Sequence, residues 1–315
     1  MTPRMEALEP RLLLSMGYSV PGDATFDCRV DLDDFVVVKR GFALAEAGWS
    51  DGDFTGDGVV SLEDFAVLKS HFGLDVLNLP VEDNPGTLKP DHVYTDVAGS
   101  LFVSAEADDA DQGYLADCYW VAAVAGIADR SPETIYQSIG EVGDGTFWVR
   151  TFDYDAKPDG NDYVERIIRI DGLLPTHDGE VIYAQPSSDG ELWAPLMEKA
   201  WAITRYSVSL YAAVEGGWPD TVFSTITGEP SPSEWVFLLT PDQLTDAIGH
   251  ALNTGSAVAM TSEDGYGPIV GWHVYTVIDA GDGWVDLYNP WGQRLTITSD
   301  VAVQAFILLS VSSVL

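Results

Sequence analysis

The 315-residue sequence has few basic residues, few cysteines and no long apolar run. Fifteen Lys and Arg residues stand against fifty Asp and Glu residues, which gives a formal charge of −35. A chain of this charge repels nucleic acids and anionic membrane surfaces. We therefore expect a cation as its partner, most of all calcium, rather than a nucleic acid. No stretch reaches the ~18–20 apolar residues that cross a bilayer, so we predict no membrane span. Adaptation to salty surroundings is the alternative explanation of the acidity.

Cys28 and Cys118 are the two cysteines of the chain. They are too sparse for a disulfide-stapled scaffold, which leaves one Cys28–Cys118 bridge or two thiols with separate roles. Because 46% of the residues are hydrophobic, the chain can build one sizeable core and a smaller module. We therefore expect a folded protein in which the residues around each thiol determine its role.

The N-terminal segment, MTPRMEALEPRLLLSMGYSV, places Arg4 and Arg11 before a short apolar patch. This patch is shorter and less regular than an ordinary cleaved secretion signal. The stretch LEPRLLLS resembles a short N-terminal motif of large exported bacterial surface proteins. We assign residues 1–16 to this motif and expect export to the cell surface or beyond, with the cytoplasm as the alternative.

An internal repeat begins at Asp23 and again at Asp53, offset by 30 residues. Each copy joins an acidic loop to an amphipathic segment, DDFVVVKRGF or EDFAVLKSHF. Loop positions 1, 3, 5, 7, 9 and 12, with glycine at 6, carry the oxygen-ligand spacing of an EF-hand-type calcium loop. The predicted Ca²⁺ ligands are Asp53, Thr55, Asp57, the Val59 carbonyl, Ser61 and Asp64 in the second copy, and Asp23, Thr25, Asp27, Asp31 and Asp34 in the first.

Cys28 occupies the position at which the second copy has Gly58. A left-handed residue there costs about 1–2 kcal/mol without glycine, so the first loop is expected to be strained and to bind calcium more weakly. The alternative is a pair of acidic turns that cap two helices without metal. Two matching copies make that alternative the weaker one.

The duplicated loop–helix resembles the dockerin type I module over residues 17–76. The resemblance implies a small helical calcium module that tethers the protein, with a cohesin-like domain as partner. The segments before the loops, YSVPG and EAGWSDG, are turn-rich rather than helical. A calmodulin-style switch is therefore disfavoured.

A proline-bearing segment, residues 77–91, follows the repeat and contains Pro80, Pro85 and Pro90. Its composition predicts an extended, semi-rigid linker and a domain boundary. In the following domain, residues 92–315, helix-like apolar runs come first and alternating strand-like runs come late. This order predicts an α+β fold.

The stretch QGYLADCYWVAAVAGIA, residues 112–128, predicts a central apolar helix that begins at Cys118. Asp117 is a suitable N-cap, and the helix dipole at the first position favours a thiolate. Gln112 offers an amide donor beside that nucleophile, the minimal equipment for acyl transfer. The alternative is a cysteine packed as a small hydrophobe.

The general base must come from five histidines. His71, His92, His177 and His250 lie in the repeat, at the edge of the linker, in a turn and near a helix end, and we set them aside. His273 differs, because the strand GWHVYTVIDA is followed by a GDG turn and a second strand, WVDLYNPWG. A hairpin centred on Gly281 sets His273 opposite Asn289, although an error of one residue in the register would separate them. Trp291 would then cover the pair.

These residues resemble the calpain cysteine peptidase signature, a Q-G-x-L-G-D-C-W motif before an apolar helix. The likeness extends through GELWAPLMEKAWA, GWHVYTV and NPWG and covers about residues 92–310. It implies a papain-like fold with a helical lobe and a β-rich lobe, and hydrolysis of internal bonds in protein or peptide substrates. It also implies Cys118 as nucleophile, His273 as general base and acid, Asn289 as orienting residue and Gln112 as oxyanion donor.

Three residues depart from the calpain pattern: Ala116, Tyr119 and Trp272 replace a glycine, a tryptophan and a smaller residue. These changes predict a narrower cleft with all the reacting atoms in place. The acidic segments DADQ and SEDGYG lie near regions in which calpain domains bind calcium, and solvated surface explains them equally well.

Two rivals to the peptidase remain. One is a catalytically silent surface or scaffold protein that keeps the fold, which the intact four-residue set opposes. The other is a dockerin-tagged polysaccharide enzyme, which lacks a clear acid pair in residues 92–315.

Overall fold

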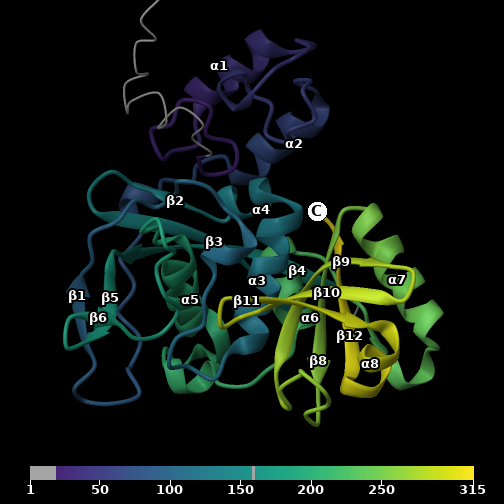
Figure 1. The fold of residues 1–315 in the computed structure, drawn as a ribbon. Helices are drawn as coiled ribbons and strands as arrows, with labels where there is room; N and C mark the ends of the chain where they lie inside the picture. The colour runs from purple at the N-terminus through teal and green to yellow at the C-terminus, as the bar shows by residue number, and fades with distance from the viewer. Residues whose placement is uncertain (1–18, 158–159) are drawn as a thin grey trace, which may run out of the picture. The chain divides into compact units, whose positions relative to one another are not determined.

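A computed structural model describes residues 19–157 and 160–315, so the predicted export motif of residues 1–16 lies outside the described residues. The chain divides into two compact units, Met1–Leu79 and Pro80–Leu315, here called unit 1 and unit 2 (Figure 1). None of the helices in the described part is both long and apolar enough to cross a membrane.

Unit 1 contains two loop–helix repeats around a small apolar core. Asp31 and Ser61 cap helices α1 (Leu32–Gly41) and α2 (Leu62–His71), and Asp34 and Asp64 complete a capping box at each start. Both helices lie on the amphipathic segments that the sequence predicts. The short 3₁₀ helices are η2 (Trp49–Asp51) and η3 (Val76–Asn78). The core is formed by Ala24, Val30, Val38, Phe54, Val60 and Leu68.

Cys28 adopts the left-handed backbone conformation that its place in the first loop predicts. Its φ is +62°, against +83° for Gly58 in the second loop. The two turns are alike, since the Cys28 and Gly58 amides each donate to the first aspartate of their loop, at 2.8 Å in both cases. Neither Cys28 nor Cys118 forms a disulfide within the described residues, so the bridge considered from the sequence is not formed.

Unit 2 is an α+β structure in which every strand pairing is antiparallel. Its three sheets have the strand orders β1-β5-β6, β2-β3-β4 and β11-β10-β9-β8-β12-β7. The strands are β1 (Val93–Asp96), β2 (Ile139–Glu141), β3 (Thr146–Lys157), β4 (Gly160–Asp171), β5 (Leu173–His177), β6 (Glu180–Val181), β7 (Ser233–Trp235), β8 (Ser256–Ser262), β9 (Val274–Gly281), β10 (Trp284–Asn289), β11 (Gln293–Thr298) and β12 (Phe306–Val314). The helices are α3 (Cys118–Arg130), α4 (Pro132–Tyr136), α5 (Trp193–Thr204), α6 (Pro219–Thr227), α7 (Pro241–Asn253) and α8 (Ser299–Ala305), with short 3₁₀ turns η4 (Ala107–Asp109), η5 (Arg205–Ser207), η6 (Tyr211–Val214) and η7 (Val236–Leu238).

Two apolar cores correspond to two lobes of unit 2 (Figure 1). The first surrounds α3 and α5, and the second lies between the six-stranded sheet and helices α7 and α8. The α+β prediction is confirmed. The first lobe is less helical than predicted, because it also holds the small sheets of β1–β6.

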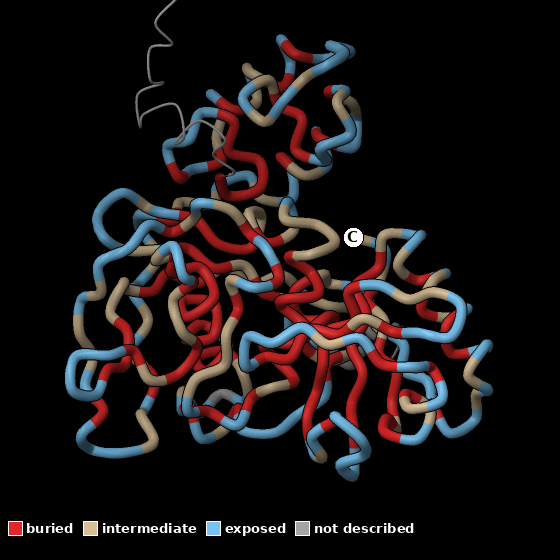
Figure 2. The backbone as a smooth tube through the Cα atoms, in the orientation of Figure 1, coloured by how far each residue is buried: buried red, intermediate tan, exposed pale blue. Residues whose placement is uncertain are grey.

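Helix α3 is the central element of unit 2. Every residue from Tyr119 to Ala128 is buried, as its red colour in Figure 2 shows. A Cβ atom at Gly126 would lie 3.3 Å from the Thr276 side chain and 3.4 Å from Ala257, so glycine lets the helix approach strands β8 and β9 closely. This approach fixes the start of α3, and Cys118 with it, beside the β-rich lobe.

Residues 80–91, predicted as part of a linker, hydrogen-bond to unit 2 along their length. The amides of Glu82, Gly86 and Leu88 donate to Arg169 O, Ser209 O and Tyr183 Oη, each at 2.8 Å. This segment is therefore part of the packed body of unit 2.

Candidate active site

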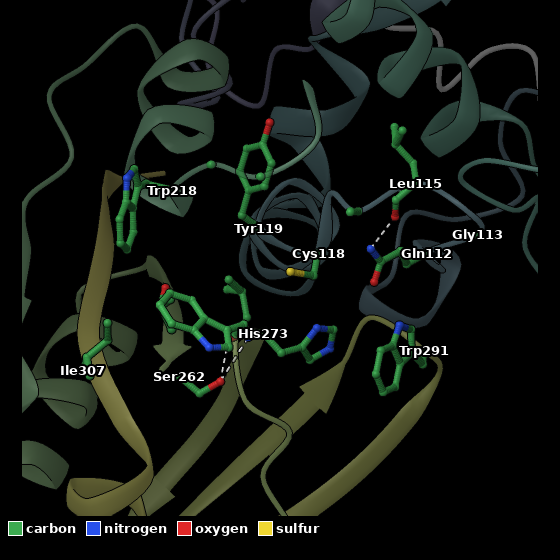
Figure 3. A pocket seen from close by; sticks show the side chains of 16 residues that line it. Gln112, Gly113, Leu115, Cys118, Tyr119, Trp218, Ser262, His273, Trp291 and Ile307 are labelled. Atoms are coloured by element: carbon green, nitrogen blue, oxygen red, sulfur yellow. Dashed lines mark hydrogen bonds between the residues drawn. The ribbon is translucent and has the colours of Figure 1, made fainter. Parts of the chain in front are cut away.

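A cavity of about 630 Å³ opens between the two lobes of unit 2 and receives side chains from both (Figure 3). Cys118, Gln112 and Tyr119 come from the first lobe, and His273 and Trp291 from the β-rich lobe. The remaining lining residues are Gly113, Leu115, Ala116, Gly216, Gly217, Trp218, Thr261, Ser262, Trp272, Val274 and Ile307.

Cys118 is the first residue of α3, as predicted, but the expected low pKa of its thiol is wrong. Asp117 holds the N-cap position without a side-chain capping bond. Burial raises the pKa of the Cys118 thiol to about 11, the Val274 amide opposes this rise by hydrogen bonding, and the charge of Asp117 adds to it. The helix start is too deeply buried for the dipole to dominate.

Asp117 faces a second buried acid, Glu198 on α5, instead of capping the helix. Burial raises the pKa of Asp117 to about 7, although a hydrogen bond from Glu198 opposes this rise. Burial also raises the pKa of Glu198 well above its ordinary value, and the neighbouring Asp117 adds to that rise. Glu198 also accepts the Ala184 amide, at 3.0 Å to Oε1. The residue before the thiol therefore belongs to a buried acid pair, which the sequence alone did not indicate.

His273 and Asn289 meet as predicted. His273 Nε2 lies 2.8 Å from Asn289 Oδ1, and the same oxygen accepts the Trp291 amide at 3.1 Å. Because Oδ1 is an acceptor, Nε2 carries the proton and Nδ1 is the basic nitrogen. The Trp291 ring covers the imidazole with centroids 4.4 Å apart. Burial lowers the pKa of His273, while the Asn289 hydrogen bond opposes the change.

The predicted register of this hairpin is wrong, and a β-bulge explains why the pair still meets. Trp284 pairs with Gly281 and Asp286 with Asp279, so the turn lies after Gly281 rather than on it. Beyond the turn, Leu287 pairs with Val277, which leaves Ile278 as the extra residue of a bulge. The bulge changes the register by one residue and returns His273 and Asn289 to the same face of the sheet.

Gln112 lines the cavity beside Cys118, as Figure 3 shows, with its amide turned toward its own loop. Its Nε2 donates to the Leu115 carbonyl at 2.6 Å, and its Oε1 is buried without a hydrogen-bond partner. The Gln112 backbone amide donates to Pro290 O at 2.7 Å, which joins the Cys118 loop to the turn after Asn289. Gln112 is thus placed at the site, and its oxyanion role stays a prediction.

The residues that depart from the calpain pattern have different surroundings. Ala116 is exposed at the cavity rim. Tyr119 is buried and its hydroxyl donates to Val214 O at 2.9 Å, so it does not block the opening. Trp272 is 76% exposed with φ +54°, a conformation that disfavours tryptophan. The sequence indicated the bulk of Trp272 but not its strain.

The predicted calcium loops of unit 1 bring positions 1, 3 and 12 together. The Thr55 hydroxyl lies 3.3 Å from Asp53 Oδ1 and 3.1 Å from Asp64 Oδ1, and both carboxylates are buried. Asp23, Thr25 and Asp34 make the corresponding contacts through the Thr25 amide. The other predicted ligands, Asp27, Asp31, Asp57, Val59 and Ser61, lie at or near the surface. Over the described residues, no loop gathers three carboxylates within 4.8 Å of one another.

A half-buried thiol at a helix start, with a histidine–asparagine pair across a two-lobed cleft, defines a cysteine peptidase site. Residues 88–297 match the model of the calpain family of cysteine proteases, so the chain belongs to that family. It is 28% identical over 214 residues to the rat calpain-1 catalytic subunit, 30% over 213 residues to the mouse calpain-2 catalytic subunit and 28% over 212 residues to the human calpain-2 catalytic subunit. Each match covers 60% of this chain and 28% of the relative, so the chain spans under a third of those relatives' length.

Proposed function

We propose that unit 2 is an endopeptidase that cleaves protein or peptide substrates through Cys118. The observation that carries this proposal is the 2.8 Å His273–Asn289 hydrogen bond on the cavity that Cys118 lines. Asn289 fixes the imidazole with Nδ1 unprotonated, so this nitrogen is the one that can accept the thiol proton. Without that fixed tautomer the thiol would have no base.

The reaction begins with transfer of the Cys118 proton to His273 Nδ1, because both groups are neutral near pH 7 in this conformation. The thiolate then attacks the scissile carbonyl carbon. The resulting oxyanion accepts hydrogen bonds from the Cys118 amide and from Gln112 after its side chain turns from Leu115. Imidazolium protonates the leaving amine, and water releases the acyl group from sulfur.

The test is casein hydrolysis by the wild-type protein and by Cys118→Ala across a calcium titration. Wild type should cleave and Cys118→Ala should not. An epoxide inhibitor of the calpain type should modify Cys118 and spare the buried Cys28. If the wild-type protein neither cleaves casein nor reacts with the epoxide, with or without calcium, the proposal is wrong.

The catalytically silent scaffold remains the second candidate, and one observation favours it. Within the described residues, no direct hydrogen bond joins Cys118 to His273, and the thiol pKa is about 11. A silent protein would keep this state under all conditions. An active one would show Cys118 alkylation that accelerates when substrate or calcium is present.

We propose that calcium binds the two loops of unit 1. Asp23, Asp34, Asp53 and Asp64 are buried carboxylates, and none of them pairs with a lysine or arginine within the described residues. Oxygen donors of this type suit Ca²⁺, and the ion would supply positive charge that offsets their burial. Asp64→Ala should weaken calcium binding in a calorimetric titration, whereas Asp33→Ala, at an exposed position outside the ligand set, should not.

A link between calcium and unit 2 is supported by a second acid pair, made of the half-buried Asp109 and the buried Glu191. Burial raises the pKa of Asp109 to about 7, and the neighbouring carboxylate of Glu191 adds to this rise. Glu191 is buried and its Oε1 faces the Val103 and Ser104 amides. Asp109 lies three residues before Gln112 of the cavity wall, so a cation bound by Asp109 and Glu191 would stabilise this part of the first lobe. Glu191→Gln should raise the calcium concentration needed for half-maximal cleavage.

Unit 1 is proposed to tether the protein to a cohesin-like domain, after export to the cell surface. Its support is a duplicated apolar face: Leu32 and Leu62 are 67% and 71% exposed, and Phe42 and Phe72 are 51% and 50% exposed. A Leu32→Ser, Leu62→Ser double variant should lose binding to a cohesin domain while wild type retains it. Detection of the chain in cell-surface fractions tests the export.

A further inference from the structure

Asp91, His92 and His177 form a cluster away from the catalytic cleft. Across residues 19–157 and 160–315, this is the group of three or more His, Cys, Asp or Glu residues whose ligand atoms all lie within 4.8 Å of one another. Strand β1 pairs with β5 so that Val93 faces Thr176, and the next step of this register sets His92 against His177. The two imidazoles are 5.8 Å apart between centroids.

Each histidine of this cluster has one ring nitrogen turned to an outer partner. His92 Nδ1 lies 3.0 Å from Tyr183 Oη, which also accepts the Leu88 amide at 2.8 Å. His177 Nε2 lies 3.6 Å from an Asp178 carboxylate oxygen, and His177 Nδ1 lies 3.6 Å from Asp91 Oδ2. Outer partners of this type orient the histidine ligands of metal sites. His177 Nδ1 also lies 3.4 Å from the Asp91 backbone carbonyl, so a metal ion bound by His92 Nε2, His177 Nδ1 and the Asp91 carboxylate would replace that contact.

We propose that His92, His177 and Asp91 bind a divalent transition-metal ion, with zinc as the cation that fits best. Two imidazoles with one carboxylate suit zinc, whereas calcium and magnesium prefer ligand sets made of oxygen. His92 is buried and Asp91 and His177 are accessible, so the ion can enter from solvent and complete its coordination with water. The excess of acidic residues in the chain favours any cation at the surface.

The ion would join two segments that are distant in sequence. His92 directly precedes strand β1, and His177 ends strand β5. The β1–β5 pairing covers four residue pairs, so a metal cross-link at its end prevents fraying. The site therefore stabilises the pairing of β1 with β5 rather than acting in catalysis.

The experiment uses the full chain carrying Cys118→Ala, because the catalytic thiol and His273 could themselves hold zinc. Excess calcium fills oxygen-ligand sites, and zinc is then titrated calorimetrically. One zinc ion per chain should bind to the Cys118→Ala protein. Adding His177→Ala to this protein should raise the dissociation constant for zinc at least tenfold. His250→Ala, a surface histidine on α7, should leave zinc binding unchanged.

A thermal measurement makes the test independent of calorimetry. Zinc at a hundredfold excess over its dissociation constant should raise the unfolding temperature by roughly 5 °C or more, and at the same zinc concentration His177→Ala should reduce that rise by about half or more. His177→Ala changes an accessible side chain, so its fold should survive, which circular dichroism verifies. Equal zinc affinity in the Cys118→Ala protein with and without His177→Ala, or absence of stoichiometric binding, would overturn the proposal.

Discussion

At the scale of single residues, the chemistry of the cleft depends on which groups surround Cys118 and how they change the pKa of its thiol. The thiol is held neutral by its surroundings, and Asp117 is the charged neighbour that contributes to this. His273 is held neutral as well. The reactive ion pair must therefore form during the reaction rather than exist beforehand.

Asp117→Asn should lower the pKa of Cys118. Removing a negative charge next to the thiol stabilises the thiolate, and at pH 8 and above Asp117 is ionised because its own pKa is about 7. Iodoacetamide alkylation of Cys118 as a function of pH measures the shift, with half-maximal rate at a lower pH than in wild type. Asp242→Asn, an exposed position on α7, should leave the profile in place, and an unshifted profile for Asp117→Asn would contradict the argument.

Trp272→Gly should both stabilise unit 2 and widen the cleft. The left-handed backbone of Trp272 costs about 1–2 kcal/mol, which glycine avoids, and little buried area is lost because the side chain is 76% exposed. We expect the free energy of unfolding to rise by about 1 kcal/mol in urea titrations and KM for casein to fall. Trp235→Gly, where φ is −74°, is the matched control and should destabilise.

The sequence correctly predicted which residues form the site, but it did not predict their pKa values. Cys118, His273 and Asn289 were identified because their types and order carry the chemistry. The thiol pKa was mistaken because burial raises it, and residues from distant parts of the chain, such as His273 and Trp218, line the cavity around Cys118. The cluster of Asp91, His92 and His177 was missed for the same reason, since His92 and His177 are 85 residues apart.

At the scale of elements, the contact of α3 with the six-stranded sheet holds the two halves of the site together. Thr276 donates from β9 to the Ala122 carbonyl of α3 at 2.7 Å, close to Gly126. Helix and sheet cannot separate without breaking that buried bond. The position of Cys118 relative to His273 is thus determined by this interface.

Glycine substitutions in two helices should have opposite effects. Gly126→Leu forces a side chain against Thr276 and Ala257 and should cost about 1–3 kcal/mol of unfolding free energy. Gly249→Ala on α7 meets no atom within 4 Å and should gain about 0.5–1 kcal/mol from helix propensity. Urea titrations of the two variants measure both values. If both variants change the free energy of unfolding by the same amount, α3 is not closely packed against Thr276 and Ala257.

Among the elements, the helices with long apolar patterns were predictable and the strands of the first lobe were not. Helix α3 carries an uninterrupted apolar run, whereas β3 and β4 mix charged and apolar residues because only part of their length is buried. The sequence predicted the pairing of β9 with β10. It did not predict the bulge, because the order of apolar and polar residues around Ile278 does not indicate one.

At the scale of the whole molecule, the buried acid pair of Asp117 and Glu198 makes stability depend on pH. Both pKa values are raised on folding, so the pair's contribution is complete below the unfolded value near 3.8 and is lost as pH rises through about 7. The unfolding temperature should therefore fall between pH 5.5 and pH 8.5. Glu198→Gln should reduce this fall, because its amide can donate to ionised Asp117.

The control for this pH experiment is Glu180→Gln, an exposed strand residue, which should keep the wild-type pH dependence. Differential scanning calorimetry gives the unfolding temperature at each pH. A Glu198→Gln curve parallel to wild type would show that the pair does not set the dependence.

The division of the chain into a repeat and a larger α+β unit follows from composition and internal similarity, which sequence displays directly. Where the second unit begins was harder to predict, because Pro80, Pro85 and Pro90 are typical of a free spacer. The amides between them nevertheless find partners in unit 2.

The bulge at Ile278 has a consequence for sequence change in this hairpin. A single residue inserted or deleted within the paired part of β9 or β10 turns His273 and Asn289 to opposite faces of the sheet. A residue added to the turn between Gly281 and Trp284 only lengthens that loop. Single-residue insertions in the turn should therefore keep activity, whereas single-residue insertions in the strands should fold without it.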